Sequence, residues 1–207
     1  MKNIAITTRI IYDKYGSVID SLDCKWIEFL SYIGFNPVII PTGVDYEKYI
    51  QLLNIDGIVF SGGDDLFSIS NNNLSKLRDE KEKIILDFAI KKSIPIYGVC
   101  RGMQFIAEYF GSKLTKVSGH VSVNHNIKST YPFWGSKYLK GLNTVNSFHN
   151  YGINILSEKL LSVAIANDFT IEAFTHKKLK IFGQMWHPER EQPYNLFDIE
   201  LINCFFN

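Results

Sequence analysis

The segment from 95 to 111, PIYGVCRGMQFIAEYFG, constrains the fold more than any other part of the chain. It opens with a short apolar run and continues after Gly102 with apolar residues at helical spacing, which predicts a buried strand passing directly into a helix. Cys100 stands at the junction, with Gly98 and Gly102 two residues to either side, so a sharp turn can form without side-chain clashes. The G-x-C-x-G pattern indicates either a nucleophile elbow or a core cysteine beside two packing glycines.

A thiol at this position has physical reasons to be reactive. The positive end of the helix dipole and the free N–H groups of the first turn favour the thiolate. The backbone N–H of Arg101 points to where an oxyanion would form during attack on a carbonyl. Far along the chain, an apolar strand pattern over 180–186 runs directly into the sequence HPE. Because proline favours extended geometry before it, we expect Glu189 to stand behind His187 and orient its ring, completing a triad with Cys100.

Taken together, these residues resemble the class I glutamine amidotransferase superfamily. Within it they resemble the free-standing gamma-glutamyl hydrolases related to gamma-glutamyl-gamma-aminobutyrate hydrolase, of the peptidase C26 type. The resemblance covers nearly the whole chain. The shared motifs are, in order, SGGDDL at 61–66, R-D-x-x-E at Arg78, Asp79 and Glu82, GVCRGMQ around Cys100, His120 with His125, VNSFHNYGI at 145–153, IEAF at 171–174, and MWHPE ending at Glu189. Several motifs in the correct order are more specific than any one of them.

The resemblance implies an α/β fold of the class I glutamine amidotransferase-like, flavodoxin-like kind. Its central sheet would be mostly parallel and flanked by helices, with added antiparallel strands in the C-terminal half. Hydrophobic patterns predict strands over 2–8, 37–40, 57–60 and 94–99, alternating with helices over 16–34, 46–53 and 76–92, then strands within 161–168, 170–176 and 179–186 and a closing helix over 194–206. We expect residues 66–75 to form a polar loop, and the whole chain, 1–207, to form a single domain of this type.

The resemblance also implies the remaining residues of the site. The backbone of Gly62 or Gly63 would supply a second oxyanion donor beside that of Arg101. Gln104 would contact the glutamyl group from one helical turn after the nucleophile. Four consecutive residues would line the substrate pocket, namely Asn146, Ser147, Phe148 and His149. The pattern of Arg78, Asp79 and Glu82 identifies the subfamily without indicating a role.

No cofactor or metal is expected. His120, His125 and His149 lie in one third of the chain, but without HxxH or HxH spacing and without neighbouring carboxylates in the sequence.

The 22 basic and 21 acidic residues give a net charge of +1, so nothing favours nucleic acid or an anionic membrane as a partner. The N-terminus lacks a secretory pattern, no apolar run is long enough to span a membrane, and three irregularly spaced cysteines favour reduced thiols. We expect a cytoplasmic monomer or homodimer that acts on a small molecule.

The resemblance predicts hydrolysis of a gamma-glutamyl amide bond through a glutamyl thioester, releasing glutamate and an amine or phosphoramidate. The short chain, rich in Asn, Lys and Ile, also looks like bacterial hydrolases that release CDP-amidate from its gamma-glutamyl precursor in capsule modification, and we favour this substrate. Arg101 is the expected cation near the scissile bond, and a base could stack on Tyr131, Phe133 and Trp134 unless these rings belong to the core. The alternatives are gamma-glutamyl-gamma-aminobutyrate hydrolysis in polyamine catabolism, a glutaminase subunit that delivers ammonia to a separate synthase, and a catalytically silent binding protein.

Overall fold

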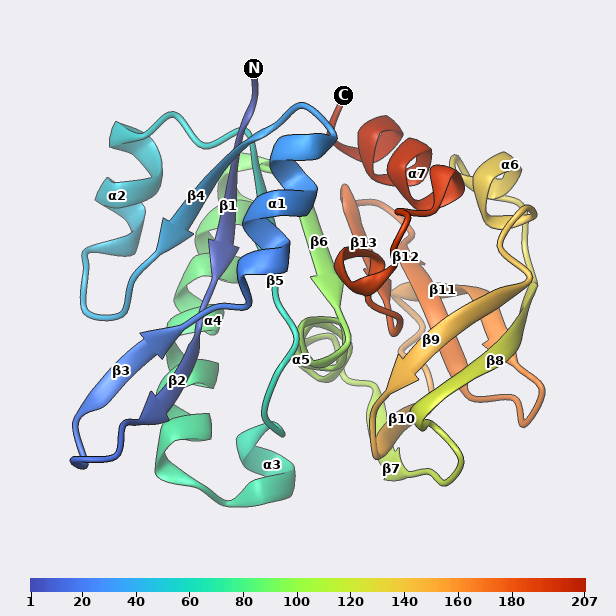
Figure 1. Cartoon of the computed structure of the whole chain (residues 1–207), viewed down its shortest axis with the longest axis horizontal. Helices are drawn as coiled ribbons and strands as arrows, with labels where there is room; N and C mark the ends of the chain where they lie inside the picture. Colours follow the sequence, from blue (N-terminus) through green and yellow to red (C-terminus); the bar gives the residue numbers. More distant parts are fainter.

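The computed structural model describes all 207 residues and is built around an 11-stranded sheet (Figure 1). Along its main path the strand order is β4-β1-β5-β6-β13-β12-β11-β8-β9. The first five strands are parallel: β4 (Asn36–Ile40), β1 (Asn3–Thr7), β5 (Gly57–Phe60), β6 (Ile96–Val99) and β13 (Ile181–Gln184). The others pair antiparallel: β12 (Ile171–His176), β11 (Leu160–Ala166), β8 (Val121–Ser129) and β9 (Thr144–Phe148). Off this path, β10 (Tyr151–Ile155) pairs with β12, and β7 (Lys113–Lys116) pairs with β10. The predicted mixed sheet, parallel first and antiparallel later, is confirmed.

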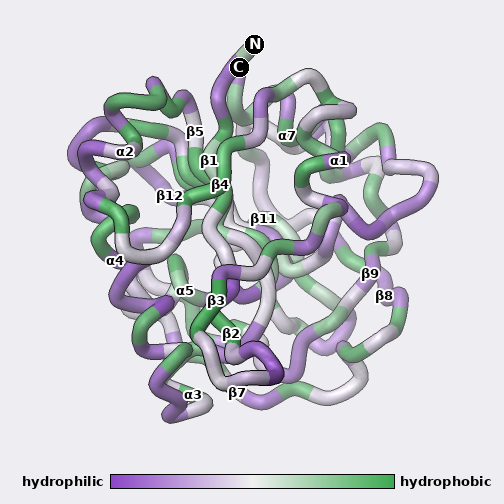
Figure 2. The backbone as a smooth tube through the Cα atoms, turned by 60° about the vertical axis from the view of Figure 1, so that its left-hand side comes forward, coloured by the Kyte–Doolittle hydropathy of each residue, from purple (hydrophilic) through white to green (hydrophobic).

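Helices cover both faces of the parallel strands because successive strand residues point to opposite sides. Ile4 and Ile6 of β1 belong to one core cluster, whereas Ala5 between them belongs to the other. The first cluster includes residues of α1 (Cys24–Tyr32) and α7 (Leu196–Phe206), and the second includes residues of α2 (Tyr46–Leu52), α4 (Asn73–Lys92) and α5 (Arg101–Tyr109). Strand β1, which lies inside the sheet, carries the hydrophobic colour of Figure 2, as a strand buried on both faces should. Two short helices, α3 (Phe67–Ser70) and α6 (Ser136–Leu139), and the 3₁₀ turn η1 (Pro188–Arg190) complete the fold.

The helix expected over 16–34 is only partly correct. Residues Val18–Ser21 form β3, which pairs with β2 (Arg9–Tyr12) in a separate antiparallel hairpin, and α1 begins only at Cys24. Asp23 sets that start, because its side chain accepts a hydrogen bond from the backbone N–H of Lys25. The apolar residues of β3 that fit the helical spacing are largely exposed on the hairpin instead.

The loop expected over 66–75 is also shorter than predicted. It contains α3, and α4 begins at Asn73, where the side chain of Asn72 accepts a hydrogen bond from Leu74 N–H. None of the helices combines the length and the apolar character that a membrane crossing requires.

The strand-to-helix turn at Cys100 depends on close backbone contacts. Cys100 has φ 52° and ψ −108°, a sparsely populated conformation for a residue with a side chain, and its N–H donates to Gln184 of the neighbouring strand. A Cβ atom added to Gly102 would lie 2.0 Å from the carbonyl oxygen of Phe60, and one added to Gly98 would lie 2.8 Å from the backbone of Gly102 and Met103. Neither position has room for a side chain, so both residues must be glycine. The G-x-C-x-G pattern around Cys100 therefore has a steric cause.

We predict that Gly102→Ala destabilises the protein by about 3 kcal/mol or more, because α5 must move away from the end of β5 to admit a methyl group. Gly111→Ala is the matched control: nothing lies within 4 Å of its Cβ position, and only its φ of +98° opposes the change, at a cost of about 1–2 kcal/mol. Urea unfolding of both variants would measure the difference. Equal destabilisation would contradict this steric account of the turn.

Candidate active site

The ends of two adjacent parallel strands bring together residues that are far apart in the sequence. Cys100 directly follows β6, and His187 follows its parallel neighbour β13, so both lie at the same edge of the sheet. Both side chains are almost fully buried. His187 Nδ1 lies 2.7 Å from Oε1 of Glu189 within the η1 turn, so the carboxylate holds the ring with Nε2 on the opposite side. The geometry is that of a thiol, an imidazole and an orienting carboxylate.

The imidazole of His187 is held in its charged form. Burial on its own lowers the pKa of His187, but Glu189 and the interaction with Cys100 outweigh this effect and raise the pKa to about 9. The ring therefore carries a proton at neutral pH, next to the sulfur. An imidazolium beside a thiol stabilises the thiolate, which is the nucleophilic form.

Gly62 and Gly63 follow β5 and approach the site from one side. A Cβ atom added to Gly62 would lie 2.7 Å from Cε1 of His187 and 3.6 Å from Cβ of Cys100, whereas one added to Gly63 would meet Arg9 and Arg78. Arg78 accounts for the orientation of this loop: its guanidinium donates to the carbonyl oxygens of Ser61 and Gly62. Because N–H and C=O point in opposite directions across a trans peptide, the N–H groups of both glycines are directed away from Arg78. The third candidate donor, the N–H of Arg101, begins α5 and has no acceptor within its own helix.

The R-D-x-x-E motif forms a buried charge network beneath this loop. Glu82 is fully buried and accepts hydrogen bonds from Thr7, from Arg78 at 3.0 Å and from Arg101. Burial alone would raise the pKa of Glu82, but the two guanidinium groups outweigh it and lower the pKa. Asp79 binds the other end of the Arg101 guanidinium. The motif thus ties the loop after β5 to the start of α5, a role that the sequence did not reveal.

The expectation for the Arg101 side chain was therefore wrong. Its guanidinium is only 1% exposed and is paired with both Asp79 and Glu82, so it is not a free cation beside the scissile bond. The residue after Cys100 could not be recognised as a network member from local sequence, because its partners lie about 20 positions earlier in the chain.

The four residues predicted to line the substrate pocket have different environments. The side chain of Asn146 accepts from the N–H of His187 at 2.9 Å and donates to its carbonyl oxygen at 2.9 Å, so it fixes the histidine backbone. Ser147 is fully buried and donates to His120 O, and the ring of His149 points toward Glu172. Only Phe148 is exposed, with its ring 5.9 Å from that of His187. A direct substrate contact by the side chains of Asn146, Ser147 and His149 is therefore not supported.

Gln104 lies within α5, one turn after Cys100, as expected from its spacing. Its side chain is buried and donates to the carbonyl oxygen of Tyr151 at 2.8 Å. This contact joins α5 to β10 of the antiparallel half and fixes the orientation of the amide.

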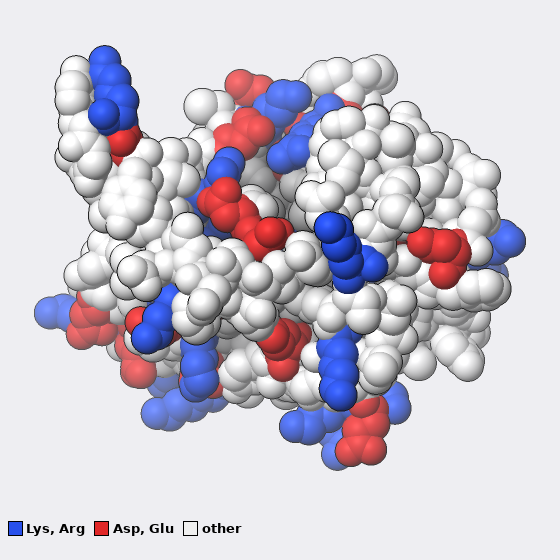
Figure 3. Space-filling model, turned by 90° about the horizontal axis from the view of Figure 1, so that it is seen from below, with Lys and Arg blue, Asp and Glu red and all other residues white.

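A cleft of about 280 Å³ opens beside His187, and its lining includes two residues that the sequence analysis missed. Arg9, from the β2–β3 hairpin, is half-exposed and pairs with Asp64 at 2.6 Å. Arg190 is one-third exposed and lies 4.7 Å over the ring of Phe148. Figure 3 looks at the carboxyl ends of the parallel strands and shows basic and acidic side chains together in a hollow of this face. Only the folded hairpin brings Arg9 here, so no local pattern could have revealed it.

The aromatic segment proposed as a stacking platform packs against the core through Phe133 and one side of Trp134, whereas Tyr131 is exposed. Phe133 stacks on Phe182 at 5.8 Å, and Trp134 packs against Phe182 and Phe205. Trp134 also lines a hollow with Lys178 and Lys180, which precede β13. Cys100 and His187 lie beyond the opposite, carboxyl ends of the strands, so these rings are not placed to stack on a base bound there.

The expectation that the histidines have no neighbouring carboxylate was also wrong. His120, His125 and His149 converge on Glu172 in the antiparallel half, with their ligand atoms within 4.8 Å of one another. Strand pairing brings Glu172 of β12 to residues more than 20 positions earlier, which sequence spacing cannot show. Three imidazole rings and one carboxylate therefore meet at a second place in the fold, apart from Cys100.

The parallel core, the buried cysteine after β6 and the histidine after β13 define an enzyme of the class I glutamine amidotransferase-like fold. A protein of Thermoplasma acidophilum that is assigned as part of a GMP synthase has the same fold, with a TM-score of 0.74 and 22% identity over 100% of this chain and 92% of that chain. Residues 4–189 match the model of the peptidase C26 family, so the chain belongs to that family, whose members hydrolyse amide bonds. Among its relatives, gamma-glutamyl-CDP-amidate hydrolase of Campylobacter jejuni is 36% identical over 99% of this chain and 97% of the relative. A glutamine-hydrolysing GMP synthase subunit of Pyrococcus abyssi is 30% identical over 77% of this chain and 79% of the relative.

A buried carboxyl group behind the site gives the protein a pH-dependent stability. Asp198 of α7 accepts a hydrogen bond from Trp186 Nε1 at 2.8 Å, directly before His187 in the chain. Burial raises the pKa of Asp198 to about 7. The negative charges of Glu191 and Glu189 also raise this pKa, whereas the hydrogen bond from Trp186 lowers it. The folded state thus keeps a proton that the unfolded chain loses near pH 3.8, so stability falls as the pH rises from about 4 to 7 and stays low above that.

We predict that Asp198→Asn stabilises the protein at pH 8 by on the order of 1–3 kcal/mol and by less at pH 5, because asparagine keeps an acceptor for Trp186 and carries no charge. Thermal unfolding at the two pH values would measure this. Asp45→Asn is the matched control, since Asp45 caps α2 at the surface and asparagine caps helices equally well. A gain that is the same at both pH values would contradict the assigned cause.

Proposed function

We propose that this amide-bond hydrolase cleaves the gamma-glutamyl amide bond of a small conjugate, with Cys100 as nucleophile, His187 as general acid and base, and Glu189 as the orienting carboxylate. The observation that carries the proposal is the convergence of a strained, buried cysteine and a charged, carboxylate-bound histidine at the ends of β6 and β13. The Campylobacter relative, whose name specifies a gamma-glutamyl substrate, supports the substrate class.

In the proposed reaction, the thiolate of Cys100 attacks the gamma-carbonyl carbon, and the N–H groups of Arg101 and of Gly62 or Gly63 bind the oxyanion. The carbon–nitrogen bond breaks as the His187 imidazolium protonates the leaving nitrogen, which leaves a glutamyl thioester. Water, deprotonated by the now neutral imidazole, attacks the thioester. The carbon–sulfur bond then breaks, glutamate leaves, and the thiolate and imidazolium are restored. Gln104, fixed by Tyr151, would face the glutamyl group.

We predict that Cys100→Ala lowers kcat/KM for a gamma-glutamyl anilide by about 10⁴-fold or more, and that His187→Ala is nearly as severe because the two groups act as a unit. Glu189→Ala should cost less, since this carboxylate acts only through the ring. Steady-state kinetics would measure all three variants. Cys24→Ala and Cys204→Ala serve as controls, because both thiols are exposed and lie outside the site. Full activity in Cys100→Ala would refute the mechanism.

The leaving group is proposed to be CDP-amidate, in keeping with the name of the Campylobacter relative. We propose that the reaction serves capsule modification. Arg9 and Arg190 support an anionic leaving group, because both line the cleft beside His187 and remain partly exposed. A diphosphate offers several oxygens to such a pair, and charge-assisted hydrogen bonds to guanidinium groups are strong. The leaving group of gamma-glutamyl-gamma-aminobutyrate has only one carboxylate. It would therefore form fewer charge-assisted hydrogen bonds with Arg9 and Arg190 than a diphosphate would.

We therefore expect kcat/KM to be higher for gamma-glutamyl-CDP-amidate than for gamma-glutamyl-gamma-aminobutyrate in side-by-side kinetics. Arg9→Ala and Arg190→Ala should each reduce kcat/KM for the nucleotide substrate about tenfold or more, and change that for a neutral gamma-glutamyl anilide little. Lys14→Ala is the matched control, since Lys14 is on the same hairpin but outside the cleft lining. A clear preference for the small amine would overturn the nucleotide assignment and leave the triad untouched.

A second candidate function is that of a glutaminase serving a separate synthase, which the identity to the GMP synthase relative of Pyrococcus abyssi favours. Such a protein would share the thiol and imidazole chemistry but release ammonia from glutamine. Ammonia release that exceeds turnover of the nucleotide substrate, and that rises when a candidate synthase is added, would support this function over a free-standing hydrolase.

A further inference from the structure

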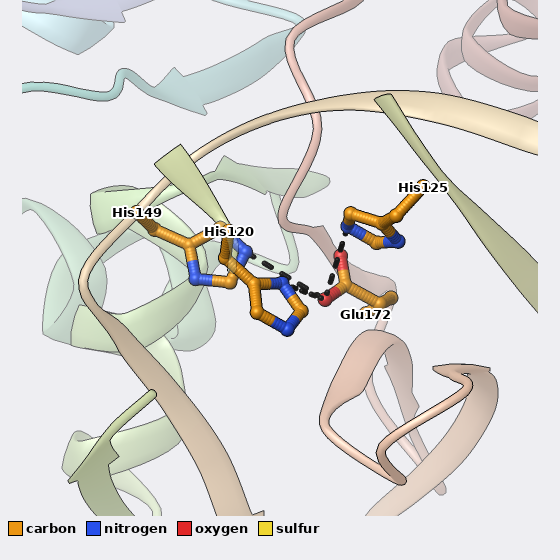
Figure 4. A group of neighbouring side chains, drawn as sticks. All are labelled: His120, His125, His149 and Glu172. Atoms are coloured by element: carbon orange, nitrogen blue, oxygen red, sulfur yellow. Dashed lines mark ion pairs between the residues drawn. The ribbon is translucent and has the colours of Figure 1, made fainter. Parts of the chain in front are cut away.

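The antiparallel half of the sheet contains a second buried polar cluster that the proposed reaction does not use. It consists of His120, which precedes β8, His125 of β8, His149 between β9 and β10, and Glu172 of β12 (Figure 4). The side chains of His120, His149 and Glu172 are 5%, 2% and 0% exposed, and that of His125 is 16% exposed. The cluster is therefore inside the protein, with His125 nearest to solvent.

In each histidine, one ring nitrogen faces Glu172 and is called the inner nitrogen here, and the other is called the outer nitrogen. Each outer nitrogen contacts a group that can only accept a hydrogen bond. His120 Nε2 lies 3.0 Å from the carboxylate of Asp168, His149 Nδ1 lies 3.0 Å from Tyr151 O, and the weaker contact of His125 Nδ1 with its neighbouring carbonyl is 3.3 Å. The outer nitrogens therefore carry the protons, and in neutral rings the inner nitrogens carry lone pairs.

The inner atoms have no hydrogen-bond partner. They are Nδ1 of His120, Nε2 of His125, Nε2 of His149 and both carboxylate oxygens of Glu172. The three nitrogens lie 3.5, 3.7 and 3.6 Å from Oε1 of Glu172, which is too long for hydrogen bonds (Figure 4). Buried polar groups are rarely left unpaired, and lone pairs facing a carboxylate repel it. A cation at the centre satisfies all of these atoms at once.

We propose that His120, His125, His149 and Glu172 bind a divalent transition-metal ion, with zinc as the best fit. Three imidazole nitrogens and one carboxylate oxygen are a donor set that suits zinc. Tetrahedral ligands at about 2.0–2.1 Å from zinc are about 3.3 Å apart. The three distances from the ring nitrogens to Oε1 of Glu172, 3.5–3.7 Å, are already close to this value, and the four ligand atoms together lie within 4.8 Å of one another, so the rings must move inward to bind the ion. Acceptors behind each histidine, here Asp168 and two carbonyl groups, are the usual partners of metal-bound imidazole.

The site lies next to the proposed glutamyl pocket. Tyr151 O accepts from His149 Nδ1 and also from Gln104 Nε2, one turn after Cys100. Ser147 and the N–H of His149 both donate to His120 O, so β9 and the start of β8 are joined at the cluster. With four protein ligands the ion would be closed to substrate, and its role would be to hold these segments and Tyr151 in place.

The test measures metal directly, on the full chain carrying Cys100→Ser, which removes a thiol that could itself bind zinc beside His187. The protein is stripped with a chelator, equilibrated with zinc chloride and desalted, and its zinc content is measured by mass spectrometry. We expect about one zinc per chain and a higher Tm with zinc than without. The added substitutions Glu172→Gln and His125→Ala should abolish both effects, and Asp168→Asn should weaken zinc affinity about 10- to 100-fold.

His176→Ala is the matched control, because His176 is the one histidine outside both the cluster and the candidate active site, and it should retain the full zinc content. Circular dichroism checks that each variant is folded. Cobalt substitution of the unmutated cluster gives a readout that needs no variant, since tetrahedral coordination produces a strong visible absorption. Zinc content in the parent no higher than in Glu172→Gln, or a full equivalent retained by His125→Ala, would overturn the proposal.

Discussion

The buried carboxylate of Glu82 is the interaction on which the geometry of the candidate active site depends. It binds Thr7 at the end of β1, Arg78 beneath the loop after β5, and Arg101 at the start of α5. Three neighbouring strand ends are thus connected through one side chain, directly below the atoms that would bind an oxyanion. Removing one partner from a buried charge pair typically costs about 3–5 kcal/mol, because the other charge stays buried and unpaired. The network therefore defines a single arrangement of this edge of the sheet.

The opposite side of the site depends on the antiparallel half of the fold. Asn146 of β9 binds both the N–H and the carbonyl oxygen of His187, and the η1 turn places Glu189 behind the imidazole ring. Parallel strands supply the cysteine and the start of the histidine segment, whereas antiparallel strands fix the orientation of the histidine. This division explains why Asn146, which was predicted to line a substrate pocket, instead fixes the backbone of His187.

The histidine cluster and the candidate active site share one carbonyl group. Tyr151 O accepts from Gln104 on one side and from His149 on the other, so the position of α5 is coupled to the arrangement of β8, β10 and β12. A cation at the cluster would hold the antiparallel strands by coordination, while the charge network around Glu82 holds the parallel strands by ion pairs. With the cation bound, the two halves would use different chemistry to stabilise a site that lies between them.

The sequence by itself determined the features that depend on neighbouring residues. The strand-to-helix turn at Cys100, the pairing of His187 with Glu189 and most of the helices and strands follow from local spacing, because steric contacts and hydrophobic period act over a few residues. Only the tertiary structure decided the β2–β3 hairpin, the presence of Arg9 in the cleft, the pairing of Arg101 with Glu82, and the convergence of three histidines on Glu172. The hairpin is local, but the spacing of its apolar residues also fits a helix, so periodicity alone did not select the strand. The other three features require segments distant in sequence to meet through strand pairing and burial, and single-sequence periodicity carries no information about which distant residues become neighbours.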